Sequence, residues 1–170
     1  MKLQLRLFNR ASNVLLLACS LSTCPSWITA NTQSKNNQEL EGYTQVSYCD
    51  LIRNLKEYEN KPIAVSASYR YGFEWQELFC MGCRGQGKTW LEFTEKNDKA
   101  VRRALRKAPR DHGIINATFY GILDGSKGPY GDGGYSYQFD VELVKDVEVV
   151  YRDGRAPELL PADVQKRLCQ

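Results

Sequence analysis

The sequence predicts a single, mainly β domain with two to three helices, and three observations support that prediction. Two long stretches, 63–73 and 135–151, alternate apolar and polar residues with the period of a half-buried strand. One segment between them, 97–108, spaces its apolar residues as an amphipathic helix does. The chain has 170 residues, which is enough for one sizeable hydrophobic core.

Residues 1–30 have the pattern of a secretory signal peptide. Their first ten residues hold three cations and no acid, a short apolar run follows at 14–21, and the segment ends at the small residue Ala30. The apolar run is too short to span a bilayer. We therefore predict that the protein is exported, either secreted or periplasmic, and that its mature chain begins after Ala30.

An alternative cleavage site lies before Cys19, because Leu16–Cys19 is similar to a bacterial lipobox. Cleavage there would attach a lipid to Cys19 and make the protein an outer-membrane lipoprotein. The polar residues 31–45 show no apolar periodicity, and we interpret them as a flexible linker. The remaining residues, 46–170, form the predicted domain.

Four cysteines remain after cleavage at Ala30, and an even number in an exported chain predicts two disulfides. Three connectivities are open for four cysteines. We favour Cys49–Cys83, which would tie the first helix to a glycine-rich turn. The second bridge is then Cys80–Cys169, which would tie down the C-terminus.

The first element of the domain is a helix at 47–58. Ser47 and Asp50 form a capping-box-like start, and Pro62 stops the helix because the residue before a proline disfavours helical structure. A strand follows at 63–73. Its alternation directs one set of side chains inward: Ile63, Val65, Ala67, Tyr69, Tyr71 and Phe73.

The later elements follow from the same periodicity and from glycine and proline signals. Short strands are predicted at 77–81 and 89–94, on either side of a glycine-rich turn at 82–87. The amphipathic helix ends at Pro109, because proline interrupts a helix. The remaining elements are a strand at 114–123, a glycine-rich loop at 124–134, a strand at 135–151 with a bend or bulge at Lys145–Asp146, and a loop with a short helix that ends at Cys169.

This order is strand, strand, strand, helix, strand, strand, which is the chain order of the OB-fold, a five-stranded Greek-key barrel. The first strand is long enough to curl and pair twice. The chain also resembles small exported OB-fold-like proteins of unassigned function, over about residues 46–150. The resemblance implies a fold but no activity. It rests on Tyr48-Cys49-Asp50-Leu51, Tyr71-Gly72-Phe73-Glu74-Trp75, the cysteine pair that follows, Trp90-Leu91-Glu92-Phe93 and Gly131-Asp132-Gly133-Gly134-Tyr135.

The segment Gly82–Thr89 matches the P-loop pattern GxxxxGK[ST] letter for letter. A P-loop needs a strand before it and a helix that begins at its lysine. Here the residues after Thr89 have strand character, and the alternation of strands and helices that builds a nucleotide-binding sheet is missing. We interpret the segment as a turn between strands, and we predict no cofactor.

Cys80 and Cys83 form a CxxC motif. Redox enzymes place the first cysteine of such a motif at the start of a helix, whereas here we expect glycine-rich chain rather than a helix after it. Cysteine thiolates can also hold zinc, but disulfides form first in an oxidising compartment, so no metal site is predicted. An exported thiol–disulfide or metal-dependent enzyme centred on Cys80 and Cys83 nevertheless remains the alternative hypothesis, because the motif itself is compatible with both chemistries.

The clearest candidate binding surface is the basic helix. Residues 96–110 hold seven lysines and arginines against one aspartate, whereas residues 111–170 are acidic overall. Such a charge run is often only a solvated face, but it can also contact a polyanion, an anionic lipid surface or an acidic protein. Four cations lie on the outer side of the helix as candidate ligand-binding residues: Arg102, Arg103, Arg106 and Lys107.

Beyond residues 1–30, cations and acids balance at 20 each, so specific binding to nucleic acid is not predicted. Membrane contact is expected only if Cys19 is lipidated. His112 is the only histidine, and no serine or acid is paired with it by spacing. The sequence therefore favours an exported, non-enzymatic binding protein. Three aromatic residues near strand ends are expected to be exposed: Trp75, Tyr130 and Tyr135.

Overall fold

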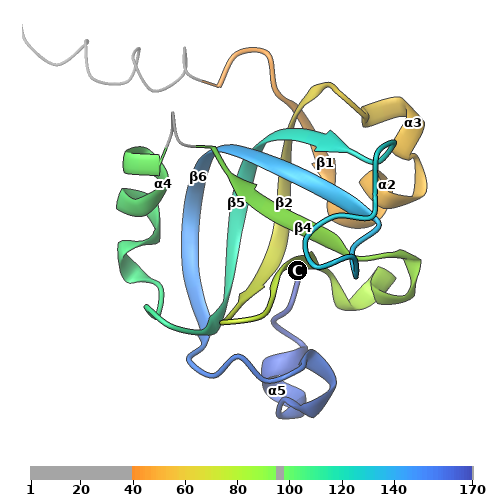
Figure 1. Cartoon of the computed structure of the whole chain (residues 1–170). Coiled ribbons are helices and arrows are strands. Elements are labelled where there is room, and N and C mark those ends of the chain that lie inside the picture. Colours follow the sequence, from red (N-terminus) through yellow and green to blue (C-terminus); the bar gives the residue numbers. More distant parts are fainter. Residues whose placement is uncertain (1–39, 95–97, 170) are drawn as a thin grey trace, which may run out of the picture.

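The computed structural model describes residues 40–94 and 98–169 (Figure 1). The predicted signal peptide, residues 1–30, and most of the predicted linker at 31–45 lie outside the described residues. The described chain is mainly β, with one mixed sheet of six strands and several short helices around it. The predicted fold class is confirmed at this level.

Six strands make up the sheet, and five of them lie close to the ranges that the periodicity predicted. The exception is β1, which takes in Thr44 and Gln45 from the end of the predicted linker. Its residues are mostly exposed, so the apolar pattern contained no signal for it. The strands are β1 (Thr44–Ser47), β2 (Pro62–Tyr71), β3 (Gln76–Phe79), β4 (Thr89–Phe93), β5 (Gly113–Asp124) and β6 (Tyr137–Tyr151).

Short helical segments connect the strands. The predicted first helix is divided at Asn54, whose backbone is not helical, and its predicted cap is present because the Ser47 hydroxyl oxygen accepts a hydrogen bond from the Asp50 amide at 3.1 Å. The predicted basic helix is an α-helix continued by a 3₁₀ turn. The α-helices are α2 (Tyr48–Arg53), α3 (Leu55–Tyr58), α4 (Asp98–Ala104) and α5 (Ala162–Gln165). The 3₁₀ segments are η1 (Met81–Gln86), η3 (Leu105–Lys107) and η4 (Pro157–Leu159).

The strands pair in the order β1-β2-β3-β4-β6-β5, and β2 also pairs with β5. Strand β2 therefore pairs with three neighbours, in parallel with β1 and antiparallel with β3 and β5. Strand β4 lies parallel to β6, and the other pairs are antiparallel. The sheet is not the regular five-stranded barrel that the sequence predicted. A sixth strand, β1, pairs with β2, and the β5–β6 ladder is irregular.

The bend predicted at Lys145–Asp146 is present as a bulge in β6. Thr118 pairs with Lys145 and Asn116 pairs with Glu148, so β6 has one residue more than β5 over this interval. Asp146 lies within the bulge and has a positive φ of 55°, so the backbone accommodates the extra residue by a local turn. The bulge lets the longest strand of the sheet bend as it pairs with both β5 and β4.

Strand β2 is partly buried on its second face as well, which simple alternation did not predict, although Ser66 on that face is exposed. Ala64 and Ser68 were expected to point outward, yet both are fully buried. The C-terminal segment covers this face near Ser68, because the Asn116 side-chain amide donates to the Arg167 carbonyl at 2.7 Å and its oxygen accepts from the Ser68 hydroxyl at 2.7 Å. A separate apolar cluster beneath α5 consists of Phe79, Ile114, Val150, Leu160, Val164 and Leu168.

The inward assignment of Phe73 was wrong, because its side chain is 99% exposed. Strand β2 ends at Tyr71, and the chain then turns so that the Gly72 amide donates to the Trp75 carbonyl at 2.9 Å. The alternation therefore stops two residues earlier than the sequence pattern indicated. The turn leaves this phenylalanine at the tip of the β2–β3 connection.

Tyr48 joins the first helix to two strands from inside the core. Its side chain is 2% exposed, and its hydroxyl donates to the Leu78 carbonyl of β3 at 2.9 Å. The same hydroxyl shares a hydrogen bond with the Thr89 hydroxyl of β4, also at 2.9 Å. Burial raises the pKa of Tyr48 well above its ordinary value, so the phenol is held neutral.

We predict that Tyr48→Phe destabilises the protein by about 1–3 kcal/mol, because the Leu78 carbonyl and the Thr89 hydroxyl lose a buried partner. Urea unfolding followed by fluorescence measures this change. Tyr151→Phe, at a half-buried position at the end of β6, is the matched control. Equal stability of the Tyr48→Phe variant and the unmodified protein would contradict the role that we assign to this hydroxyl.

Candidate functional site

A pocket of about 360 Å³ opens where the basic helix meets the end of β2. Three arginines and two tyrosines line it, with small apolar side chains between them. Its residues are Tyr69, Tyr71, Arg102, Leu105, Arg106, Ala108, Pro109 and Arg110. We call it the arginine–tyrosine pocket.

The apolar stripe of α4 and η3 decides which arginines reach this pocket. Val101 is 2% exposed and Leu105 packs against the same core, so one side of the helix is pressed onto the sheet. Arg102 and Arg106 are one helical turn apart and lie next to that stripe, on the same side. The chain becomes extended at Ala108, and this change of direction brings Arg110 to the pocket as well.

The rim of the pocket is held by a contact between β2 and the loop after the helix. The Tyr71 hydroxyl donates a hydrogen bond to the Pro109 carbonyl. Gly113, which pairs with Tyr71 at the start of β5, leaves room for this loop. A Cβ atom at Gly113 would lie only 2.8 Å from Cγ of Pro109, so a larger residue would push the loop away.

The two tyrosines form a stacked pair at the base of the site. Their ring centroids are 5.2 Å apart with an interplanar angle of 25°. Tyr69 also makes edge-to-face contacts with Phe93 and Phe119, so its ring is fixed by the core. Burial raises the pKa of Tyr71 to about 12 and that of Tyr69 further still, so both phenols are neutral beside the guanidinium groups.

The structure brings together only part of the residue set that the sequence proposed. All four side chains are exposed, but only Arg102 and Arg106 line the pocket, whereas Arg103 and Lys107 do not. Arg110 was not among the proposed binding residues, although it belongs to the same basic run. Its charge was the one feature of the sequence that could have indicated a place in the pocket. Tyr69 and Tyr71 were assigned to the core. Alternation shows that a side chain points inward, but it does not show whether one edge of its ring borders a cavity.

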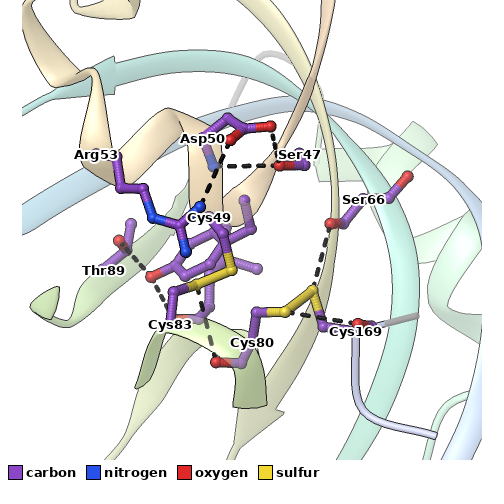
Figure 2. The surroundings of a disulfide bond; sticks show 11 residues. Ser47, Cys49, Asp50, Arg53, Ser66, Cys80, Cys83, Thr89 and Cys169 are labelled. Carbon is purple, nitrogen blue, oxygen red and sulfur yellow. Dashed lines mark hydrogen bonds and ion pairs between the residues drawn. A yellow bond between two sulfur atoms is a disulfide. The ribbon is translucent and has the colours of Figure 1, made fainter. Parts of the chain in front are cut away.

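The four cysteines that follow residue 40 form two neighbouring disulfides (Figure 2). Cys49 is bonded to Cys83, with a Cα–Cα distance of 5.5 Å, and Cys80 is bonded to Cys169, with a Cα–Cα distance of 4.9 Å. This is the connectivity that we favoured from the sequence. The CxxC cysteines are therefore each bonded to a distant partner, and sulfurs in disulfides are not ligands for zinc.

The P-loop interpretation receives no support from the local structure. Thr89 begins strand β4 rather than a helix, and its buried hydroxyl is bonded to Tyr48. The segment before it is the short 3₁₀ segment η1, followed by Gly87 with a φ of 118°. A threonine hydroxyl used in this way is not free to bind a metal–nucleotide complex.

One of the three aromatic residues expected to be exposed is buried. Tyr135 is 6% exposed, because its ring packs edge-on against Trp90 with the centroids 5.0 Å apart. Trp75 and Tyr130 are half-buried. The loop that contains Tyr130 and Tyr135 folds back on itself, and the Tyr130 amide donates to the Tyr135 carbonyl at 3.0 Å.

Comparisons with known proteins assign no family to the chain. No protein-family model matches it, and no curated protein matches it significantly. Among the helices that the structure describes, none has both the length and the apolar character needed to cross a bilayer. Any statement on function must therefore rest on the chemistry of the described residues.

We predict that the stability of the protein falls as the pH rises from about 10 to about 12. Burial raises the pKa of Tyr71 from 10.0 to about 12, so the unfolded chain loses this proton first and unfolding becomes more favourable in that interval. Urea midpoints measured across the interval show the fall. Tyr71→Phe should reduce it, and an unchanged pH dependence in that variant would contradict the assignment.

Proposed function

We propose that the protein is a non-enzymatic binding protein for an anionic ligand, and that the arginine–tyrosine pocket is the binding site. The single observation that supports this proposal is the convergence of three arginines on one cavity beside two neutral tyrosines. No carboxylate belongs to the lining. Among the described residues that line the pocket, the charges are therefore all of one sign.

The chemistry of the lining indicates the class of ligand. A guanidinium group is planar and donates paired hydrogen bonds to a carboxylate, sulfate or phosphate group. The tyrosine rings, Leu105 and Pro109 offer apolar surface next to these donors. A cavity of about 360 Å³ suits one anionic group together with the ring that carries it, such as a sulfated sugar unit of a polyanion.

We propose further that the closed circuit of pairings β2-β3-β4-β6-β5 is a small Greek-key barrel of the OB type. The support is the pairing of β2 with both β3 and β5, the parallel pairing of β4 with β6, and the position of α4 between β4 and β5 in the chain. An experimental structure in which β2 and β5 are not paired would contradict this proposal.

We propose that the protein is exported, in soluble form or as an outer-membrane lipoprotein. The two disulfides give weak support, because such bonds persist in oxidising compartments. The main support is the sequence of residues 1–30, which has the basic start, the short apolar run and the small final residue of a secretory signal peptide.

Mass spectrometry of the mature protein tests the export proposal. We expect an N-terminus at Asn31, directly after Ala30, or at Cys19 with an attached diacylglycerol. The first result identifies the soluble form and the second the lipoprotein. An intact Met1 on a native protein with reduced cysteines would contradict export altogether.

We predict that a heparin tetrasaccharide binds the pocket and that Arg106→Gln and Arg110→Gln each weaken this binding roughly tenfold. A charge-assisted hydrogen bond contributes about 1.5 kcal/mol, which corresponds to that factor. Isothermal titration calorimetry measures the affinity, with a neutral tetrasaccharide as the ligand control.

Arg103→Gln and Lys107→Gln are the matched protein controls, because these residues belong to the same basic segment but do not line the pocket. They should change the affinity less than about twofold, because they make no direct contact with a ligand in the pocket and their longer-range charge is screened by solvent. Equal losses in all four variants would indicate a diffuse charge effect and would contradict a pocket. Phenyl phosphate, a small aromatic anion, is a second probe for the same pocket. If neither the heparin tetrasaccharide nor phenyl phosphate binds, the proposed function is contradicted.

A further inference from the structure

Three sulfur atoms from two different disulfides lie close together. The Sγ atoms of Cys49, Cys80 and Cys83 are all within 4.8 Å of one another. Figure 2 shows the Cys80–Cys169 bridge beside the Cys49–Cys83 bridge, with Cys80 nearer to the other pair. Disulfide exchange requires a sulfur to approach a neighbouring bridge, so this spacing puts Cys80 within reach of a second reaction partner.

The backbone already brings Cys80 and Cys83 together. The Cys83 amide donates a hydrogen bond to the Cys80 carbonyl at 3.2 Å, at the start of the turn η1. A bridge between these two residues therefore needs a change in side-chain direction rather than a new fold of the chain. The two possible bridges of Cys83, to Cys49 and to Cys80, compete for the same sulfur.

Burial separates the four cysteines into an inner and an outer pair. Cys80 and Cys83 are 5% and 4% exposed, whereas Cys49 and Cys169 are half-buried. Cys169 also lines a second cavity, of about 320 Å³, together with polar side chains such as Asn116 and Arg167. A thiol from outside can therefore approach the Cys169 sulfur through this cavity, while the inner sulfurs are covered.

We propose that the four cysteines form a thiol–disulfide exchange site, in which Cys80 transfers its bond from Cys169 to Cys83. An external dithiol is the reductant. One of its thiolates attacks Sγ of Cys169, a mixed disulfide forms, and Cys80 leaves as a thiolate. The Cys80 thiolate then attacks Sγ of Cys83, so that the Cys80–Cys83 bond forms and Cys49 leaves as a thiolate.

The second thiol of the dithiol completes the reaction. It attacks the mixed disulfide, releases Cys169 as a thiolate, and closes the reductant into a disulfide. The protein has then gained two electrons and two protons, which are held as the thiols of Cys49 and Cys169. The external dithiol has lost the same number, so the reaction is balanced.

This exchange would have a structural consequence at the C-terminus. In the described structure α5 is joined to the rest of the domain by the Cys80–Cys169 bond and by its apolar contacts through Val164 and Leu168. After exchange only the noncovalent contacts remain, while the CxxC bridge keeps the turn η1 closed. The site thus couples the redox state of a partner dithiol to the attachment of the last segment.

The experiment uses the full mature chain with Cys169→Ser, which leaves the Cys80 thiol beside the Cys49–Cys83 bridge. We expect exchange to place a free thiol on Cys49 in more than about a tenth of the molecules, with Cys80 bonded to Cys83. Acid quenching, alkylation and peptide mapping identify which cysteine carries the label. A label found on Cys80 alone would overturn the proposal.

Cys80→Ser is the matched control. It leaves a free thiol on Cys169, whose sulfur is not one of the three within 4.8 Å, so the Cys49–Cys83 bridge should persist and only Cys169 should be labelled. Labelling of Cys49 in this control would show that exchange does not depend on Cys80, which overturns the proposed path.

A measurement on the unmodified protein keeps the proposal testable if either variant fails to fold. The unmodified protein is treated with a limiting amount of dithiothreitol, and its two-electron-reduced form is mapped. Labels on Cys49 and Cys169, with a Cys80–Cys83 bridge, support the exchange path. Labels on Cys80 and Cys169, with Cys49–Cys83 intact, would contradict it.

Discussion

The short segment 80–83 holds one end of each disulfide, and both ends of the described domain depend on it. Through Cys83 it is bonded to the first helix, 34 residues earlier in the chain, and through Cys80 it is bonded to Cys169, 89 residues later. Cross-links that close loops of this length stabilise a small protein by roughly 3–5 kcal/mol each, mainly by restricting the unfolded chain. Helices as short as α2 and α5 have little stability of their own. The two disulfides therefore matter most at these helices, which they attach to the rest of the domain.

The arginine–tyrosine pocket and the sulfur site are built on different elements that pack against one common core. Figure 1 shows α4 at one side, whereas α2 and the η1 connection between β3 and β4 lie at the other. The pocket depends on the stripe that presses α4 and η3 onto the sheet, and on the contact of Tyr71 with Pro109. The sulfur site depends on covalent bonds and on one turn. Ligand binding at one site and exchange at the other are therefore separable in experiments.

Local patterns predicted many elements correctly, and their failures share a physical cause. The Ser47 cap and the bulge near Asp146 were predicted because each is decided by neighbouring residues. Strand β1 was missed because its partner, rather than its own apolar pattern, defines it. Phe73 and Tyr135 were misplaced for a related reason, since alternation does not show where a strand ends or what packs against a loop.

By itself, the sequence determined the order of the five strands after β1, the basic character of one segment and the need to pair four cysteines, because these follow from local periodicity, charge and number. Only the tertiary structure decided between three connectivities, by placing Cys49 beside Cys83 and Cys169 beside Cys80. It also selected Arg102, Arg106 and Arg110 from a longer run of cations. Which side chains share a cavity depends on how distant strands and helices pack, and that information is not contained in any single stretch of the chain.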